Sequence, residues 1–464
     1  MKYKILFLIF FRLAVHAQDG SLDNSFLVGT GVDLDVFLIH QLSSEKILIG
    51  GQFTNYNGFV VNGLARLDLQ GNLDNSFHSG IGGNYFKVYD LVEEENKLLI
   101  VGEFGLYDSV NRYGLARLNL DGTLDPTFDP GLGANRRVLR ISKQADKYII
   151  TGSFSSYNGY PCGNIARINS DGSIDQSFFS QGTEVGLQRA IVDHIIQSDG
   201  RIMIVGEFFT YNGIPTQRIA RLNADGTLDN TFNPGTGPNR VVRSITIQAD
   251  GKYIIGGLFG NYNGFSAPLI ARINSDGSFD STFSPDSGYG IAASSLIVQP
   301  DQKILAAGVM TTLGGDGKFL HRLMPDGTID SDFDSTQGFN NDINIMTMQH
   351  DGKILVGGLF DRFNDFGINR IARINNNLNL STHFSKTEHD WYPNPIKDKL
   401  FYKLNSSEEL VLVTGVDLSG KVLMLPLEYY SSGVVVDTSK LYPGAYLFNF
   451  QTSKGNTIIK VFKQ

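Results

Sequence analysis

Short apolar runs separated by polar turns recur along most of the chain, and one unit of about 51 residues shows the plan. In this unit the runs 241–248 (VVRSITIQ) and 253–259 (YIIGGLF) flank Asp250-Gly251, a pair typical of tight turns. The following segment 270–283 (IARINSDGSFDSTF) is divided in the same way by Asp276-Gly277. We therefore expect each unit to form four short strands joined by two hairpins, which is the form of a propeller blade.

The second hairpin is repeated seven times at a nearly constant period. Its invariant arginines, spaced by 50 to 54 residues, are Arg66, Arg117, Arg167, Arg221, Arg272, Arg322 and Arg373. A fixed period of this size indicates a repeat architecture, so we predict a seven-bladed β-propeller. A Tyr-Asn-Gly sequence, as at 262–264, is expected to turn the chain between the second and third strands while its tyrosine packs inside.

Each repeated arginine has an aspartate eight residues later. A three-residue turn Ala224-Asp225-Gly226, with the glycine left-handed, would place Arg221 directly opposite Asp229, and facing opposite charges stabilise a strand pair by roughly 0.2–1 kcal/mol. The same spacing predicts the pairs Arg66 with Asp74, Arg117 with Asp125, Arg167 with Asp175, Arg272 with Asp280, and Arg322 with Asp330. We interpret these as structural ion pairs, in preference to seven arginines that grip an anion.

The seventh copy lacks this aspartate, because Ser381 stands eight residues after Arg373. The segment 19–26 (DGSLDNSF) supplies one, since Asp23 precedes Phe26 by three residues, as Asp229 precedes Phe232. We predict that residues 19–26 form the outer strand of the last blade, pair Asp23 with Arg373 and close the ring, which removes two exposed sheet edges.

The two ends of the chain differ from the repeats. Residues 1–17 carry two lysines, an apolar run and a small-residue end, which predicts a secretory signal peptide; no other run is long enough to span a bilayer. Residues 18–385 form the propeller, 386–396 a linker, and 397–464 read as short strands of a small C-terminal β-sandwich. The expected fold class is therefore all-β. Cys162 is the only cysteine, so no disulfide forms within the chain.

The charge is concentrated in the predicted propeller. The signal segment carries +3 and residues 386–464 carry +1, so the total of −8 leaves −12 for residues 18–385. An acidic body argues against nucleic acid and anionic membranes as partners, because both attract basic surfaces. Cations and neutral ligands remain open.

Candidate chemistry is expected where the repeats disagree. The position after the second glycine of each middle strand varies most, and it holds Gln52, Glu103, Ser153, Glu207, Leu258, Val309 and Leu359. If this position faces the ring centre or a rim, Glu103 and Glu207 would form a carboxylate pair suited to glycoside chemistry. The alternative is two solvated glutamates.

A longer third interval, 180–190, brings Glu184, Arg189 and His194 together locally, and these are candidate ligand-binding residues. A tolerated insertion is the alternative. The eight histidines have no metal-ligand spacing, so no metal site is expected. The recurring N-x-D-G-x-x-D resembles calcium loops but lacks their further carboxylates, so it is interpreted as turn chemistry, and no cofactor is predicted; a bound calcium ion is the alternative.

The seven hairpins, with their Gly-Gly-x-Phe and Tyr-Asn-Gly companions, resemble the delta-60 repeat family of β-propellers over about residues 19–385. This resemblance implies a secreted or surface propeller and no shared chemistry. The tail resembles the C-terminal sorting domain of the type IX secretion system of Bacteroidota. The matching residues are Tyr392-Pro393-Asn394-Pro395, Asp417-Leu418-Ser419-Gly420-Lys421, Leu441, Gly444, Tyr446 and the ending from Lys460 to Lys463.

The tail's resemblance implies export through the periplasm and the outer membrane by the type IX machinery, then release or anchoring at the cell surface. Two classes of function remain for the mature protein, which we expect to be a monomer. It is either a non-catalytic binding or adhesion module for an extracellular glycan or protein, or an exported glycoside hydrolase or lyase that uses rim carboxylates. The lack of a recognisable active-site motif favours the binding module.

Overall fold

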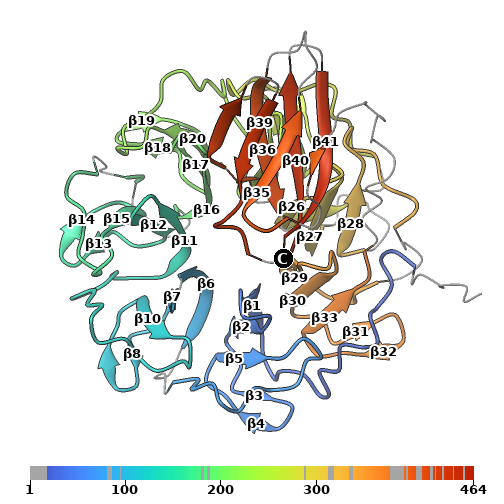
Figure 1. Cartoon of the computed structure of the whole chain (residues 1–464). Coiled ribbons are helices and arrows are strands. Elements are labelled where there is room, and N and C mark those ends of the chain that lie inside the picture. Colours follow the sequence, from blue (N-terminus) through green and yellow to red (C-terminus); the bar gives the residue numbers. More distant parts are fainter. Residues whose placement is uncertain are drawn as a thin grey trace, which may run out of the picture.

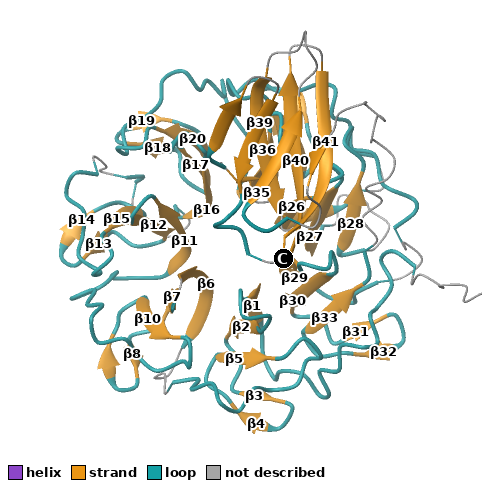
Figure 2. Cartoon of the chain, in the orientation of Figure 1, coloured by secondary structure: helices purple, strands orange, loops and turns teal. Residues whose placement is uncertain are grey.

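The computed structural model describes residues 18–80, 86–94, 96–178, 182–184, 189–286, 289–311, 318–333, 338–376, 391–392, 396–403, 410–417, 422–423, 425–430, 433–442, 444–452 and 455–463. The predicted signal peptide (1–17), most of the predicted linker and the second half of the seventh hairpin lie outside these residues. Every regular element in the described ranges is a strand (Figure 2). None of the described residues forms a helix of the length and apolar character needed to cross a membrane.

Seven blades surround a common centre (Figure 1). The inner strands are β1 (Val36–Gln41), β6 (Lys87–Glu94), β11 (Val138–Gln144), β16 (Ile191–Ile196), β21 (Val242–Ile247), β26 (Ile291–Val298) and β29 (Ile343–Met348). The middle strands are β2 (Ile47–Gly51), β7 (Lys97–Glu103), β12 (Lys147–Gly152), β17 (Ile202–Gly206), β22 (Tyr253–Gly257), β27 (Ile304–Met310) and β30 (Ile354–Gly358). The third strands are β5 (Leu64–Leu67), β10 (Leu115–Asn119), β15 (Ile165–Ile168), β20 (Ile219–Leu222), β25 (Ile270–Ile273), β28 (Leu320–Leu323) and β33 (Ile371–Ile374).

The fourth strand expected in each blade is reduced to a single bridge, such as Leu222 with Leu228. The reason is the aspartate that follows. The Asp229 carboxylate accepts hydrogen bonds from the Thr231 amide and hydroxyl at 2.9 and 2.6 Å, and this local turn competes with continued pairing. Each blade is thus a three-stranded antiparallel sheet with a short bridged edge.

The Tyr-Asn-Gly sequences, and the corresponding sequences at 107–109 and 363–365, form separate hairpins of two-residue strands instead of simple turns. These are β3–β4 (Asn55–Tyr56, Phe59–Val60), β8–β9 (Leu106–Tyr107, Val110–Asn111), β13–β14 (Ser156–Tyr157, Tyr160–Pro161), β18–β19 (Thr210–Tyr211, Ile214–Pro215), β23–β24 (Asn261–Tyr262, Phe265–Ser266) and β31–β32 (Arg362–Phe363, Phe366–Gly367). The tyrosine is buried, and its hydroxyl donates to a backbone carbonyl of the next hairpin, as from Tyr211 to Gly226 at 2.6 Å. The five small hairpins that carry a tyrosine are therefore fastened to the body of their blades.

Adjacent blades pack face to face through apolar side chains. The middle strands are buried along their whole length in most blades, because both of their faces lie against neighbouring blades. One core cluster joins Met203 and Val205 of the fourth blade to Val242, Ile245 and Ile255 of the fifth. The core is thus a series of layers between blades, one for each contact around the ring.

The two chain ends meet in the seventh blade. Leu22 bridges Ile374, and the Asp23 amide donates to the Arg373 carbonyl at 2.7 Å. The amide of Gly20 also donates to the Asn375 carbonyl at 2.8 Å. Residues near the start of the described chain thereby complete the last blade.

The C-terminal residues form two four-stranded sheets. One has the order β34 (Trp391–Tyr392), β35 (Lys399–Lys403), β39 (Gly433–Asp437), β38 (Leu427–Tyr430); the other has the order β37 (Val422–Leu423), β36 (Leu410–Asp417), β40 (Gly444–Thr452), β41 (Gly455–Lys463). Both sheets contribute to one apolar cluster, in which the rings of Tyr402 and Phe450 stack at 3.8 Å. All members of this cluster belong to the tail, so the tail has a core of its own.

Candidate functional site

The register divides the ring into two faces. One face of the ring contains the starts of the inner strands and the ends of the middle strands. It therefore carries the varied position after the second glycine, and we call it the variable face. The Asp-Gly turns and the repeated arginines lie at the other ends of the same strands, on what we call the latch face. The candidate residues predicted from the sequence are divided between these two faces and the blade interior.

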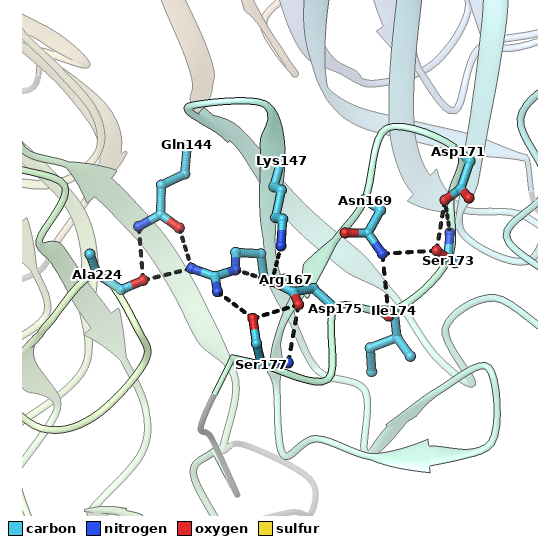
Figure 3. A network of polar contacts seen from close by, with 10 residues as sticks. All are labelled: Gln144, Lys147, Arg167, Asn169, Asp171, Ser173, Ile174, Asp175, Ser177 and Ala224. Carbon is cyan, nitrogen blue, oxygen red and sulfur yellow. Dashed lines mark hydrogen bonds and ion pairs between the residues drawn. The ribbon is translucent and has the colours of Figure 1, made fainter.

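On the latch face, each repeated arginine is paired with an aspartate. The arginine Nε donates to the aspartate Oδ2 at 2.6–3.0 Å in the pairs Arg66–Asp74, Arg117–Asp125, Arg167–Asp175, Arg221–Asp229, Arg272–Asp280, Arg322–Asp330 and Arg373–Asp23. A basic side chain from the first turn of the blade reaches the same carboxylate, as Lys147 does at 2.8 Å from Asp175 (Figure 3). Two cations therefore neutralise one acid.

The arginine also connects its own blade to the next one. In Figure 3 the Arg167 guanidinium donates to the Ala224 carbonyl of the following blade at 2.7 Å and to the Ser177 hydroxyl at 3.2 Å. Its Cζ lies 5.0 Å from the centre of the Phe178 ring, a cation–π contact. We call this set of contacts the latch. The hydrogen bond from the arginine to the next blade depends on how the blades are arranged in the ring, so the residue spacing within one repeat does not predict it.

The latch carboxylates are held ionised. Burial on its own would raise the pKa of Asp74, but hydrogen bonds from Ser76 and the charge of Arg66 outweigh it and lower the pKa to about 2. The same balance lowers the pKa of Asp23, Asp125, Asp175, Asp229, Asp280 and Asp330. All the donors that hold these carboxylates come from the protein itself, so the latch face has the chemistry of a structural network.

On the variable face, Glu103 and Glu207 belong to the second and fourth blades, and the third blade stands between them. The Glu103 carboxylate accepts a hydrogen bond from the Tyr89 hydroxyl at 3.2 Å and lies 3.7 Å from the Lys87 ammonium. Glu207 lies close enough to Arg243 to affect that guanidinium's pKa. Each glutamate is thus associated with a different cation, and the described contacts do not join the two.

The three residues of the long third interval have different positions. Glu184 accepts hydrogen bonds from the amides of Phe209 and Thr210 at 2.6 and 2.8 Å, and Arg189 lies 3.7 Å from its carboxylate. His194 is not near them; it is buried on β16, with Nδ1 2.8 Å from the Thr151 hydroxyl. The structure therefore brings Glu184 and Arg189 together and leaves His194 in the blade interior.

Glu184 has counterparts in other blades that hold the same two loops together. Asp33 accepts from the amides of Thr54 and Asn55, and Asn135 accepts from those of Ser155 and Ser156. The equivalent residues Asn239 and Asn340 accept from the corresponding amides in the fifth and seventh blades. The Glu184 carboxylate thus has the geometry of a loop clamp. The sequence does not reveal that these residues are equivalent, because the residue type differs between blades and is Asp, Asn or Glu.

A half-buried chain of charges near the centre of the ring was not predicted. The guanidinium of Arg140 lies 3.2 Å from the Asp193 carboxylate, which also accepts from the Ile245 amide at 3.0 Å. Asp90 accepts from the Ile141 amide at 3.0 Å in the same way. Each of these side chains directly follows a β-bulge in its inner strand, which is an edge strand of its sheet. They tie neighbouring inner strands together.

The variable face is basic over three consecutive blades. Arg136 and Arg137 precede β11, Arg189 precedes β16, and Arg240 precedes β21. The guanidinium Cζ atoms of Arg189 and Arg218 lie 4.4 and 4.3 Å from the centre of the Phe209 ring. We call Arg136, Arg137, Arg189, Arg218, Arg240 and Arg243 the arginine arc. It lies within a body whose net charge is acidic.

No group of three or more His, Cys, Asp or Glu side chains in the described ranges could hold a metal ion. In the loop that resembles a calcium site, the Asp171 carboxylate accepts from the Ser173 amide and hydroxyl at 2.9 and 2.7 Å. The Asn169 amide also donates to the Ser173 hydroxyl, at 2.9 Å (Figure 3). These polar groups satisfy one another within the turn.

Comparison with solved structures supports the fold. The WD40 β-propeller domain of Doa1 aligns with a TM-score of 0.50 and 15% identity, over 78% of this chain and 97% of that one. The extracellular domain of a putative one component system from B. thetaiotaomicron aligns with a TM-score of 0.49 and 14% identity, over 94% of this chain and 53% of that one. No curated protein sequence matches the chain.

Two family models match the sequence. The model described as "Domain of unknown function (DUF5122) beta-propeller" matches seven segments, 43–77, 96–128, 144–178, 197–232, 248–283, 299–333 and 349–384, which together make up more than half of the chain. The model described as "Secretion system C-terminal sorting domain" matches residues 390–464, and a type IX sorting tail directs export to the cell surface or the medium. The chain therefore belongs to the DUF5122 β-propeller family, the family of delta-60 repeats, and carries a type IX sorting domain at its C-terminal end.

Proposed function

We propose that the exported protein is a non-catalytic binding or adhesion module that holds an extracellular glycan or protein on its variable face. One observation carries the proposal: the residues before the inner strands differ between blades on this face, whereas the latch face repeats the same neutralised ion pairs. The residues at this position are Leu34, Phe86, Arg136, Arg189, Arg240, Ile291 and Asn341, and all of them except Phe86 and Ile291 are exposed or half-buried. A rigid scaffold with varied loops on one face is a common arrangement for recognition.

The contacts of the two predicted carboxylates favour binding over hydrolysis. A glycosidase needs two carboxyl groups on opposite sides of the scissile bond, about 5–9.5 Å apart. Glu103 is engaged by Tyr89 and Lys87, and Glu207 belongs to a blade two positions away in the chain. An exported polysaccharide-acting enzyme therefore has less support from this arrangement than a binding protein.

A glycan array with the protein that lacks only residues 1–17 tests the proposal, with Ser153→Trp as the blocking variant. Ser153 is half-buried at the varied position of the third blade, so an indole there obstructs the variable face. The matched control is Ser170→Trp, on an exposed turn of the latch face. We expect binding that Ser153→Trp reduces and Ser170→Trp leaves unchanged, without release of reducing ends from the bound glycan. Steady release of reducing ends, or equal binding by both variants, would contradict the proposal.

A further inference from the structure

The fourth blade carries an aromatic side chain on the variable face at a position where the other blades have small or polar residues. Phe209 stands where other blades carry Thr54, Gly105, Ser155, Gly260 or Asp361. Arg189 and Arg218 both place their guanidinium groups against this phenylalanine ring, at 4.4 and 4.3 Å from its centre. The aromatic ring attracts both guanidinium groups, and it thereby holds two positive charges close together although they repel each other.

The two guanidinium groups are only partly compensated by the protein. Burial, and after it the nearby charge of Arg189, lower the pKa of Arg218, as expected for two like charges held against one ring. Arg218 donates to the Pro238 carbonyl at 3.1 Å, and Arg189 is 3.7 Å from Glu184, whose oxygens already accept from Phe209 and Thr210. An anion placed against both guanidinium groups would relieve their repulsion and receive charge-assisted hydrogen bonds.

The remaining arginines extend this positive region along the ring. Arg136, Arg189 and Arg240 occupy the equivalent position before the inner strands of three consecutive blades. No ion pair links Arg136 or Arg240 to another residue that the structure describes, whereas Arg243 lies near the carboxylates of Asp342 and Glu207. Positive groups that are repeated from blade to blade are complementary to a ligand with regularly repeated negative groups. A linear acidic polymer has such groups.

We infer that the arginine arc binds an acidic polysaccharide, a polymer with carboxylate or sulfate groups, with Arg189 and Arg218 as its central anion site. The inference rests on the proposed function, because it specifies the ligand class of the same face. It also accommodates the net charge of −8, since the arc is a local exception on an acidic molecule and like charges elsewhere steer the polymer toward it.

The test measures affinities of the protein lacking residues 1–17 for polygalacturonate, dextran sulfate, neutral dextran and poly-L-glutamate by isothermal titration calorimetry. Polygalacturonate and dextran sulfate distinguish the carboxylate from the sulfate source. We expect one of the two to bind, neutral dextran not to bind, and affinity to fall as salt rises.

Arg218→Gly is the informative variant. Arg218 has a left-handed backbone (φ 71°), and Gly63 and Gly114 hold the equivalent position in the first two blades, so the change removes a cation without straining the fold. We expect about a tenfold loss of affinity for Arg218→Gly and a similar loss for the double variant Arg136→Ala/Arg240→Ala. The control Arg362→Ala removes one exposed arginine from the seventh blade, outside the arc, and should bind like the unchanged protein.

Three results would overturn the inference: equal affinity in the arc variants and the control, equal binding of neutral dextran, or preference for poly-L-glutamate over both acidic polysaccharides. The last result would identify an acidic protein as the partner instead. A neutral glycan whose binding is blocked by Ser153→Trp but not by the arc variants would leave the proposed function intact while refuting this inference.

Discussion

A histidine occupies an apolar position inside the fourth blade. The equivalent side chains of the other blades are Ile39, Leu91, Ile141, Ile245, Leu296 and Met346. His194 is 4% exposed, and its Nε2 atom has no hydrogen-bond partner in the described part of the chain. Burial and then the nearby charge of Arg140 lower the pKa of His194 to about 3. The imidazole is therefore kept neutral in the folded protein.

This residue should make the folded protein less stable in mild acid. Between pH 6.5 and 3 the unfolded chain binds a proton at His194 that the folded chain excludes, so the free energy of unfolding falls as pH decreases through this window. We expect His194→Leu to flatten the decline in thermal midpoint between pH 7 and 4.5. The latch aspartates do not interfere, because their folded pKa is lowered and their contribution is lost only below the unfolded value of 3.8. Parallel declines in the two proteins would refute the assignment.

The elements of each blade could be predicted because the repeat shows every turn several times. The Asp-Gly turns and the spacing that places Arg221 opposite Asp229 follow from pairing rules that act within about ten residues. The shared seventh blade was predictable because Arg373 lacks the aspartate that every other copy has, while Asp23 occurs in the same local sequence near the other end. The length of the fourth strand could not be predicted, since it depends on whether the Asp229 carboxylate binds its own turn or leaves the backbone free to pair.

The candidate site was predictable only in part, for a similar reason. Glu184 and Arg189 are close in sequence and meet in space, but Phe209 and Arg218 reach them from the small hairpin and the third strand. Contacts between elements depend on how the elements pack against one another, and the spacing of residues along the chain does not predict this packing. His194 is near Arg189 in sequence but does not join it in space. The side chain of His194 points into the blade interior because it occupies a buried position of strand β16.

The first turn of the third blade contains a local conflict between sequence and conformation. Gln144 pairs with Lys147, so Ala145 and Asp146 form a two-residue turn, and Ala145 has φ 55°. A left-handed alanine costs roughly 1–2 kcal/mol, and glycine avoids this at the expense of greater freedom in the unfolded chain. We expect Ala145→Gly to stabilise the protein by about 0.5–1 kcal/mol in urea unfolding. Asp146→Gly, at a turn position without positive φ, should not stabilise it.

At the scale of the whole molecule, total charge and local charge have different meanings. The net charge of −12 for residues 18–385 argued against nucleic acid and anionic membranes as partners, but this net charge averages over two faces that the fold separates. Many of the acids are confined to the latch face, where Arg and Lys neutralise them, whereas six arginines are gathered over three blades of the variable face. Which ligand the molecule attracts therefore depends on which face is presented, and only the fold defines the faces.

Closure of the ring rests on a latch that joins the two ends of the propeller. Asp23 accepts from Arg373 at 2.7 Å and lies 2.9 Å from Lys353, and both partners are more than 300 positions from Asp23 in the chain. The other latches join residues within one hairpin, as Arg66 and Asp74 do at 3.0 Å. The loss of Asp23 would leave a nearly buried Arg373 without its carboxylate and would also free an end of the ring.

We therefore expect Asp23→Ala to destabilise the protein by about 2–4 kcal/mol and Asp74→Ala by about 1–2 kcal/mol, because the first change affects ring closure and the second affects one hairpin. Thermal unfolding followed by circular dichroism, with both variants at the same concentration and pH 7, compares them directly. Asp23→Asn should fall between the unchanged protein and Asp23→Ala, since its single amide oxygen can keep one of the two hydrogen bonds, from Ser25 or from Arg373, that the carboxylate accepts on separate oxygens. Equal midpoints for Asp23→Ala and Asp74→Ala would show that the chain ends contribute no more than an ordinary blade, and that the propeller is held shut by packing between blades alone.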